Sequence, residues 1–159
     1  MKIIKDTREK QGWDFVFYDD VTDVISRKID CGDYTTDFLE GKIVIERKAT
    51  PEEVANNLGK ILNRKRFERE LIRMEPLKKA YIVCEFPECD LYSYPDRTKK
   101  ILKNARANGK YLMKVFGSFQ ETYPNIEIVF CNSKDEAEKF TYDILKFWTK
   151  YYASTSEQE

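Results

Sequence analysis

The sequence predicts an α/β fold, with a central mixed β-sheet flanked by helices, and two observations carry this prediction. Short apolar or β-branched runs, typical of buried strands, recur along the chain at residues 2–5, 43–48, 80–85 and 125–131. Helical spacing of apolar residues fills the longer stretches 50–76 and 133–152. With 159 residues and 42% hydrophobic content, the chain can bury the core of one domain, which we expect to span residues 1–153.

The first part of the chain predicts two strands joined by an aromatic loop. Residues 2–5 form the first strand, which delivers Asp6 and Glu9 to its C-terminal end. A second strand is expected over residues 26–30, before a turn at Gly32. In the loop between them, we expect three aromatic side chains to pack in the core: Trp13, Phe15 and Phe17.

A hairpin is predicted next, with residues 34–38 paired to residues 42–48 around Glu40-Gly41. The second arm begins with Ile43-Val44-Ile45, and three β-branched residues in succession favour a buried strand. The fold-back of this hairpin brings Asp33, just before the first arm, toward the end of the second.

The charged residues that end this hairpin carry the candidate chemistry. Because side chains alternate between the two faces of a strand, Glu46 and Lys48 point the same way and Arg47 points away. Asp33 and Glu46 then place two carboxylates beside one lysine, the minimal equipment for metal-assisted phosphodiester hydrolysis. The carboxylates hold a hard cation such as Mg²⁺, which polarises the phosphate and lowers the pKa of a bound water. The lysine orients that water or offsets developing charge.

This pattern resembles the PD-(D/E)xK nuclease core, with Asp33, Glu46 and Lys48 in its three positions. A longer form of the pattern is more specific. Gly32-Asp33 followed by Ile-Glu-Arg-Lys at residues 45–48 is similar to the GD…VERK signature of the XPF-type structure-specific endonucleases.

Two more motifs of that family occur in the right order. Its upstream D-x-R-E motif is present at residues 6–9, and an apolar strand that ends in Glu is present at residues 81–85. The family usually writes ERKxxxD, but the final position here is Glu52, which keeps the charge and predicts altered positioning. The resemblance covers roughly residues 1 to 130 and implies a restriction-endonuclease-like fold.

The resemblance also implies a Mg²⁺-dependent DNA endonuclease in which Mn²⁺ can substitute. The residues that it implies for catalysis are Asp33, Glu46, Lys48, Arg47, Asp6 and Glu9. The implied metal ligands are Asp33, Glu46, the carbonyl of Arg47, and Asp6. Branched DNAs such as flaps, forks and four-way junctions are the substrates in the family.

The stretch that follows the hairpin predicts helix. Thr50 is a good N-cap, Pro51 suits the first helical position, and Glu53 completes a capping box. Gly59 leaves open whether one long helix or two joined helices follow. A loop is predicted over residues 89–95.

Net charge is zero overall but unevenly distributed. Residues 60–114 carry 15 basic and 7 acidic side chains, while the flanking segments 1–59 and 115–159 each have a net charge of −4. From Arg97 to Lys114 there are seven basic residues and no acidic one, which suits a helix along a phosphate backbone. Solvated helix faces are the alternative interpretation.

Basic residues near the motifs are candidates for DNA contact. In the family, the helix after the ERK strand carries a basic residue that faces the scissile phosphate, for which Arg66 and Arg69 are the candidates and Arg64 and Lys65 further possibilities. Pairing with acidic residues of the same helix is the alternative. The full set of predicted DNA-binding residues is Arg8, Arg66, Arg69, Lys99, Lys100, Lys103 and Arg106.

A last helix is predicted from the capping box Ser133–Glu136 to about Tyr152, followed by a frayed tail at 154–159. Its aromatic stripe is wider than one sheet face needs: Phe140, Phe147, Trp148, Tyr151 and Tyr152. Core packing is the default interpretation. Part of the stripe could also be a homodimer surface, since XPF-type nuclease domains commonly pair.

Several classes of function and site are excluded or disfavoured. The absence of histidine excludes Ser-His-Asp and Cys-His catalysis and His-ligated metals. Four cysteines with only one close pair predict reduced thiols rather than a zinc site. No apolar run approaches the ~20 residues of a membrane span and no signal-peptide core is present, so we expect an intracellular protein with no membrane partner, in cytoplasm or nucleoid, or in the nucleus of a eukaryote.

Two other functions stay open. The family includes inactive partners that dimerise with active ones, so a non-catalytic DNA-binding or scaffolding subunit is the main alternative, although such partners typically lose the catalytic residues. RNA cleavage is the second alternative. These 159 residues show no paired helix-hairpin-helix module, so a helix-hairpin-helix protein or another DNA-binding partner could supply specificity.

Overall fold

The computed structural model describes residues 1–95 and 107–156. All strands of this part of the chain belong to one six-stranded sheet in the order β2-β1-β3-β4-β5-β6. The strands are β1 (Lys2–Lys5), β2 (Asp23–Ser26), β3 (Tyr34–Thr36), β4 (Ile43–Lys48), β5 (Lys79–Cys84) and β6 (Ile126–Phe130). Strand β3 is antiparallel to both β1 and β4, whereas the pairs β1–β2, β4–β5 and β5–β6 are parallel. The predicted mixed sheet is confirmed.

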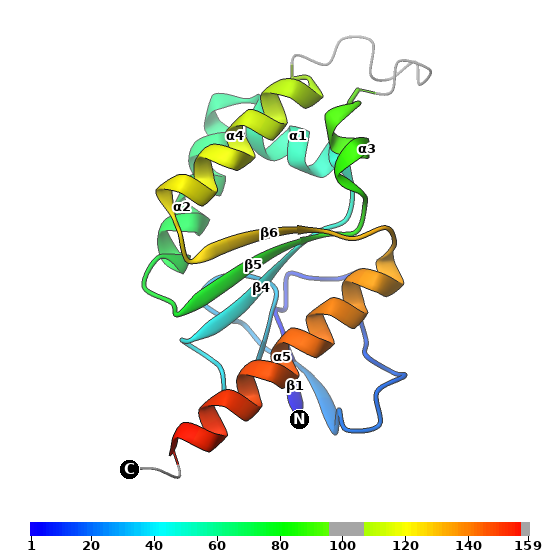
Figure 1. Ribbon diagram of the computed structural model, residues 1–159, viewed down its shortest axis with the longest axis vertical. Coiled ribbons are helices and arrows are strands. Elements are labelled where there is room, and N and C mark those ends of the chain that lie inside the picture. Colours follow the sequence, from blue (N-terminus) through cyan, green and yellow to red (C-terminus); the bar gives the residue numbers. More distant parts are fainter. Residues whose placement is uncertain (96–106, 157–159) are drawn as a thin grey trace.

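Helices cover both faces of this sheet. They are α1 (Pro51–Gly59), α2 (Ile61–Met74), α3 (Glu88–Tyr92), α4 (Gly109–Thr122) and α5 (Lys134–Ser156). Figure 1 shows α1, α2 and α4 on one face and α5 on the other. None of the helices in the described ranges is long and apolar enough to cross a membrane.

Alternate side chains of β4 fill two separate cores. Val44 packs with the cluster that includes Leu58 of α1 and Phe67 of α2. Ile45 packs on the opposite face with the cluster that includes Leu145 of α5. Each such fully buried aliphatic side chain contributes about 1.5–3 kcal/mol. β4 is therefore held from both sides, which makes its end a rigid platform for the charged residues that follow.

The helix predictions at the centre of the chain are confirmed in detail. The side-chain oxygen of Thr50 accepts from the Glu53 N–H at 3.2 Å, and Pro51 begins α1. Lys60 has extended backbone (φ −114°, ψ 138°), so the stretch forms two helices rather than one. At α5, Ser133 caps the Glu136 N–H at 3.2 Å, as the capping box predicts.

Other predictions are corrected. The second strand covers Asp23–Ser26 rather than residues 26–30, because it pairs along the full length of β1 and leaves residues 27–30 to lead into the Gly32 turn. Its side chains are mostly exposed, so its apolar signal is weak. Residues 89–95, expected as loop, include most of the short helix α3. α5 runs to Ser156, so the first part of the expected frayed tail is helical.

The aromatic loop is predicted correctly for two of its three anchors. Trp13 and Phe15 are buried at 1% and 2% exposure, but Phe17 is 87% exposed. Phe15 adopts a left-handed backbone conformation (φ 56°), which turns the chain outward directly after its buried ring. Sequence alone does not reveal such a turn at a non-glycine residue. The basic stretch predicted as helix lies outside the described residues from 97 to 106.

Candidate active site

The turn at Gly32 fixes Asp33 at the edge of the sheet. Gly32 has φ 73°, and a Cβ atom there would lie 2.4 Å from Cγ2 of Val44. The chain is pressed this closely against β4 because the Asp33 N–H donates to the Ile45 carbonyl at 2.7 Å. Only glycine fits this position, which explains why the motif has a glycine directly before Asp33.

The carboxylate of Asp33 is in turn held by β4. Its Oδ2 accepts from the backbone N–H of Arg47 at 2.8 Å. Burial and the neighbouring charge of Glu46 raise the pKa of Asp33 well above its usual value, and this hydrogen bond opposes the rise. Two carboxylates thus converge at the end of β4, as the hairpin predicts.

Glu46 and Lys48 lie on the same face of β4. The Lys48 ammonium donates to Oε1 of Glu46 at 2.9 Å and lies 3.7 Å from Oε1 of Glu53. Burial alone would lower the pKa of Lys48, but the charges of Glu46 and Glu53 raise it above its usual value. Lys48 therefore stays protonated at neutral pH. In this form it can orient a water or offset negative charge.

The side chain of Arg47 points to the opposite face and is held there by two glutamates. Its guanidinium donates to both oxygens of Glu85 at 2.7 and 3.1 Å and to Glu9 at 3.3 Å, above the ring of Trp13. The side chains of all three charged residues are at most 12% exposed. Glu85, the glutamate that ends the predicted strand at residues 81–85, is therefore paired with a basic residue.

Four carboxylates open onto one cleft of about 450 Å³ beside β4. They belong to Glu9, Asp33, Glu46 and Glu53. The basic residues Arg8, Lys10 and Arg47 also line this cleft. Opposite charges in one concave site are what a polyanionic substrate and a cation need together.

Asp6 does not line this cleft. It is fully buried, with its oxygens accepting from the Arg8 side chain and the Arg8 N–H, and from the Ile29 N–H at 2.9 Å. Burial raises the pKa of Asp6, but these donors outweigh it and lower the pKa overall. Of the predicted acidic cluster, the structure brings together Asp33, Glu46 and Glu9, and leaves Asp6 beside them in a structural network.

The donor set fits a hard divalent cation. Asp33 and Glu46 supply carboxylate oxygens, and the mutual repulsion that raises the pKa of Asp33 is what a bound cation would offset. The described residues contain no group of three or more His, Cys, Asp or Glu side chains arranged to hold a metal. Mg²⁺ commonly keeps several waters and takes one or two carboxylates, so Asp33 and Glu46, with the predicted carbonyl of Arg47, suffice.

Comparison with known proteins agrees with this geometry. The family model described as the ERCC4 domain matches residues 5–144. The chain belongs to the ERCC4 domain family. This confirms the predicted relation to XPF-type nucleases and covers the whole of the site.

Solved structures agree with the fold of an ERCC4 domain. XPF from Aeropyrum pernix superposes with a TM-score of 0.67 at 18% identity, covering 99% of this chain and 70% of that one. XPF from Aeropyrum pernix in complex with DNA gives a TM-score of 0.64 at 18% identity, covering 94% of this chain and 65% of that one. A search of curated proteins finds no match.

At the last position of the ERCC4 motif, the structure differs from what the spacing indicates. Spacing alone points to Glu52, but the residue that lines the cleft is Glu53, which also accepts from the Ala49 N–H at 2.8 Å. Glu53 lies in the first turn of α1, where Thr50 caps its N–H, and its carboxylate faces Lys48. The signal that could have found it is the capping box itself, because a glutamate that reaches back over the first turn must lie near the end of β4.

The predicted DNA-binding residues of this ERCC4 domain separate into three groups. Arg8 lines the cleft, and Arg66 lines an adjoining hollow next to Glu46. Arg69 is exposed on α2 and lines neither, and Arg64 pairs with Glu68 at 3.1 Å. The remaining candidates lie outside the described residues: Lys99, Lys100, Lys103 and Arg106.

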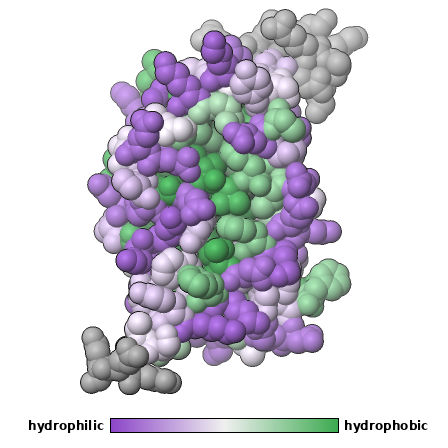
Figure 2. All heavy atoms as spheres, viewed as in Figure 1, coloured by the Kyte–Doolittle hydropathy of each residue, from purple (hydrophilic) through white to green (hydrophobic). Residues whose placement is uncertain are grey.

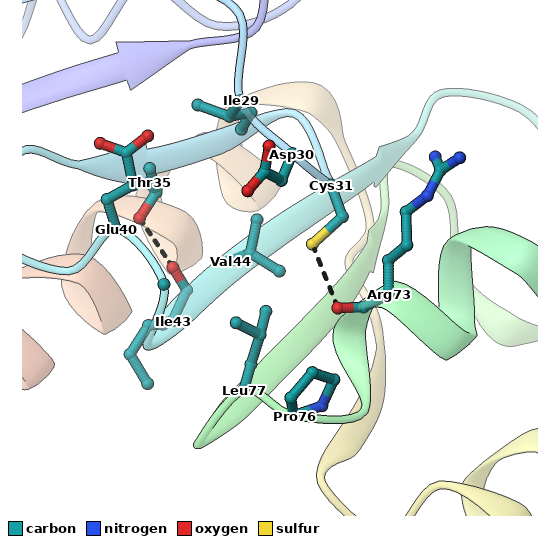
Figure 3. Close-up of a pocket in the computed structure, with 11 residues that line it drawn as sticks. Ile29, Asp30, Cys31, Thr35, Glu40, Ile43, Val44, Arg73, Pro76 and Leu77 are labelled. Carbon is teal, nitrogen blue, oxygen red and sulfur yellow. Dashed lines mark hydrogen bonds between the residues drawn. The ribbon is translucent and has the colours of Figure 1, made fainter.

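A further hollow of about 250 Å³ lies behind the Gly32 turn, between the β3–β4 hairpin and the end of α2 (Figure 3). The thiol of Cys31 points into it and donates to the Arg73 carbonyl at 3.8 Å. Burial raises the pKa of Cys31 to about 11, so the thiol stays protonated. All four cysteines are free, consistent with the predicted reduced thiols.

Proposed function

We propose that the protein is a divalent-metal-dependent endonuclease that cleaves phosphodiester bonds in branched DNA, such as flaps, forks or four-way junctions, and that it acts as a homodimer inside the cell. One observation carries the proposal: Asp33 and Glu46 open onto the same cleft, with the buried Lys48 ammonium 2.9 Å from Glu46. The ERCC4 family membership supports the reaction class.

Each group in the cleft has a role that its geometry supports. Asp33 and Glu46, with the Arg47 carbonyl, would hold Mg²⁺ or Mn²⁺. The bound cation would polarise the scissile phosphate and lower the pKa of a coordinated water. Lys48, protonated and fixed beside Glu46, would orient the attacking water and offset the charge that develops on the phosphate.

DNA as substrate is supported by charge and by a structural relative. Arg8 lines the cleft, Arg66 lines the hollow beside it, and the 60–114 segment carries a large basic excess. The relative from Aeropyrum pernix is a complex with DNA. A helix-hairpin-helix protein or another DNA-binding partner would add branch specificity.

The test is cleavage of a panel of linear, nicked, flap, fork and four-way-junction DNAs, with a matched RNA, in Mg²⁺, in Mn²⁺ and in EDTA. Asp33→Asn or Glu46→Gln should lower the rate at least about a thousandfold while DNA binding and the melting temperature hold. Asp30→Asn, an exposed aspartate three residues before Asp33, is the matched control and should cut normally. Near-wild-type cleavage by either site variant would overturn the metal assignment, and an inactive wild-type protein that still binds DNA would identify a non-catalytic subunit.

A further inference from the structure

The segment 9–13 forms one rim of the cleft beside β4, and we call it the rim loop. Three consecutive residues of this loop line the cleft: Glu9, Lys10 and Gln11. The Glu9 carboxylate accepts from the Arg47 guanidinium of β4 at 3.3 Å, and the Gln11 carbonyl accepts from a lysine of α5 at 3.3 Å. The chain is therefore tied to the rest of the molecule on both sides of Lys10.

A buried tyrosine holds the far end of the rim loop. Asp33 lines the cleft, whereas Tyr34, the next residue, is fully buried behind it in the core. The Tyr34 hydroxyl accepts from the Trp13 N–H at 2.7 Å, and the two rings stack with their centroids 4.9 Å apart. A Cβ atom on Gly12 would lie only 1.6 Å from the same hydroxyl oxygen, so the backbone of the loop rests directly on it. One phenol oxygen thus sets the position of the rim loop.

The cations in and beside the cleft differ in whether a carboxylate already neutralises them. Three are paired: Arg8 with Asp6 at 2.7 Å, Arg47 with Glu85 at 2.7 Å, and Lys48 with Glu46 at 2.9 Å. Lys10 is exposed, lines the cleft and forms no ion pair with any residue that the structure describes. Its ammonium is therefore available to an anion that enters the cleft.

From these contacts we infer that Lys10 binds a backbone phosphate of the DNA in the cleft, and that Tyr34 is the residue that positions it. A lysine on a loop that is already fixed loses less conformational freedom on binding than one on a free loop. Such a contact adds affinity without reading sequence. The inference rests on the proposed nuclease function and names a residue that would hold its substrate. Asp33 and Glu46 are fixed by the Gly32 turn and β4, so the rim loop should affect DNA binding rather than the chemical step.

The first test measures binding of a flap DNA by fluorescence anisotropy in Ca²⁺, which limits cutting, and single-turnover cleavage in Mg²⁺. Lys10→Ala should weaken binding about five- to tenfold near 0.1 M salt and flatten the slope of log K against log salt by about 0.9. The cleavage rate constant at saturating DNA should stay within about twofold of the wild-type value. Lys10→Arg keeps the charge and should bind like the wild type. Lys2→Ala, which removes an exposed lysine at the other end of β1, is the control.

The second test asks whether Tyr34 acts through Lys10. Tyr34→Phe keeps the stacked ring but leaves the Trp13 N–H buried without its acceptor, so the rim loop should shift. Binding should weaken as in Lys10→Ala, and Tyr34→Phe should add no further loss to a protein that already carries Lys10→Ala. Tyr81→Phe is the matched control, because the Tyr81 hydroxyl accepts from the Trp148 indole N–H at 2.9 Å and does not line the cleft. It should lower the melting temperature and leave DNA affinity unchanged.

Two results would overturn the inference. One is a Lys10→Ala protein with wild-type affinity and salt slope, which decides the question even where Tyr34→Phe does not fold. The other is an additive loss in the double variant, folded by circular dichroism, which would show that Tyr34 does not act through Lys10. A wild-type protein that binds DNA without cutting it removes the nuclease proposal, and the binding measurements then still decide whether Lys10 holds DNA. Absence of DNA binding by the wild type removes both.

Discussion

Two aspartates with similar sequence contexts have opposite environments in this protein. Asp6 and Asp33 both lie near the end of a short strand and belong to family motifs. The pKa of Asp33 is raised by burial and by Glu46, whereas that of Asp6 is lowered overall by the donors around it. A carboxylate that accepts hydrogen bonds from neighbouring donors of the chain stabilises the fold. A carboxylate that faces another carboxylate is instead placed to bind a cation.

Asp6→Asn should therefore lower the free energy of unfolding by about 2 kcal/mol at pH 7, because it removes charge-assisted bonds from Arg8 and leaves buried donors poorly paired. A lowered carboxyl pKa stabilises the fold above the unfolded-state value, near pH 4, and that contribution disappears as pH falls through the folded-state value. Urea unfolding should thus show a gap between wild type and variant at pH 7 that closes at acid pH.

The result also decides between two roles for Asp6. An Asp6→Asn protein with unchanged stability, but with no cleavage and weaker Mg²⁺ activation, would restore the metal-ligand role that the resemblance implies. Asp30→Asn again serves as the charge-matched control.

At the scale of elements, the end of β4 is stabilised by an ion pair that crosses to the end of β5. Glu85 and Arg47 are almost fully buried and form two hydrogen bonds. The same Arg47 supplies, through its backbone N–H, the hydrogen bond that orients Asp33. The ion pair that holds the Arg47 side chain therefore also fixes the backbone that orients Asp33 in the candidate active site.

A double-mutant cycle on Arg47→Gln and Glu85→Gln should give a coupling energy of about 1–3 kcal/mol in urea unfolding, because each single change leaves the other charge buried. The bidentate pair Arg27–Glu40 has similar distances but is nearly half exposed on both sides, so its coupling energy should be much smaller than that of Arg47–Glu85. Equal coupling energies in the two pairs would show that burial does not strengthen the Arg47–Glu85 pair.

How well each element can be predicted from the sequence depends on how clear its pattern of apolar residues is. The β-branched run of β4 and its alternation placed Glu46, Arg47 and Lys48 on their correct faces. The second strand was misplaced because an edge strand with exposed side chains carries little apolar pattern. Tertiary contacts, such as the reach of Glu53 to Lys48 and the enclosure of Asp6, depend on elements distant in the sequence or on turn geometry that no local pattern encodes.

At the scale of the whole molecule, α5 carries the surface through which we propose that a second copy binds. Phe147 and Tyr151 of α5 are 58% and 45% exposed, while Trp148 donates to the Tyr81 hydroxyl at 2.9 Å and packs on the sheet. Figure 2 shows apolar side chains gathered at the centre of the viewed face, where Figure 1 places β6 between α4 and α5. An exposed apolar surface of this kind marks an interface more often than a free face.

Phe147→Glu should split the proposed homodimer while the circular dichroism signal is retained, because its side chain points outward. Trp148→Glu should instead lower the melting temperature, since it breaks the bond to Tyr81. Sedimentation velocity at tens of micromolar distinguishes the two. A wild-type protein that sediments as a monomer, with and without DNA, would remove the homodimer proposal.

The basic segment predicts a salt dependence that involves the whole molecule. Replacing Lys99, Lys100 and Lys103 by Ala should weaken binding to all DNA sequences alike. The slope of log K against log salt should flatten by about 0.9 for each phosphate of duplex DNA that the variant no longer neutralises. Fluorescence anisotropy between low and high salt measures both quantities. If affinity and slope are unchanged in the triple variant, these lysines are only a solvated surface.

The division of the sheet into two faces has a consequence for how such proteins can diversify. The groups proposed for cleavage lie at the end of β4 and on the Gly32 turn, while the proposed pairing surface is α5, on the opposite face from α1 and α2. After gene duplication, one copy could lose Asp33 or Glu46 through a single codon change and still associate through α5. Heterodimers of one active and one silent chain are thus a short evolutionary step from this architecture.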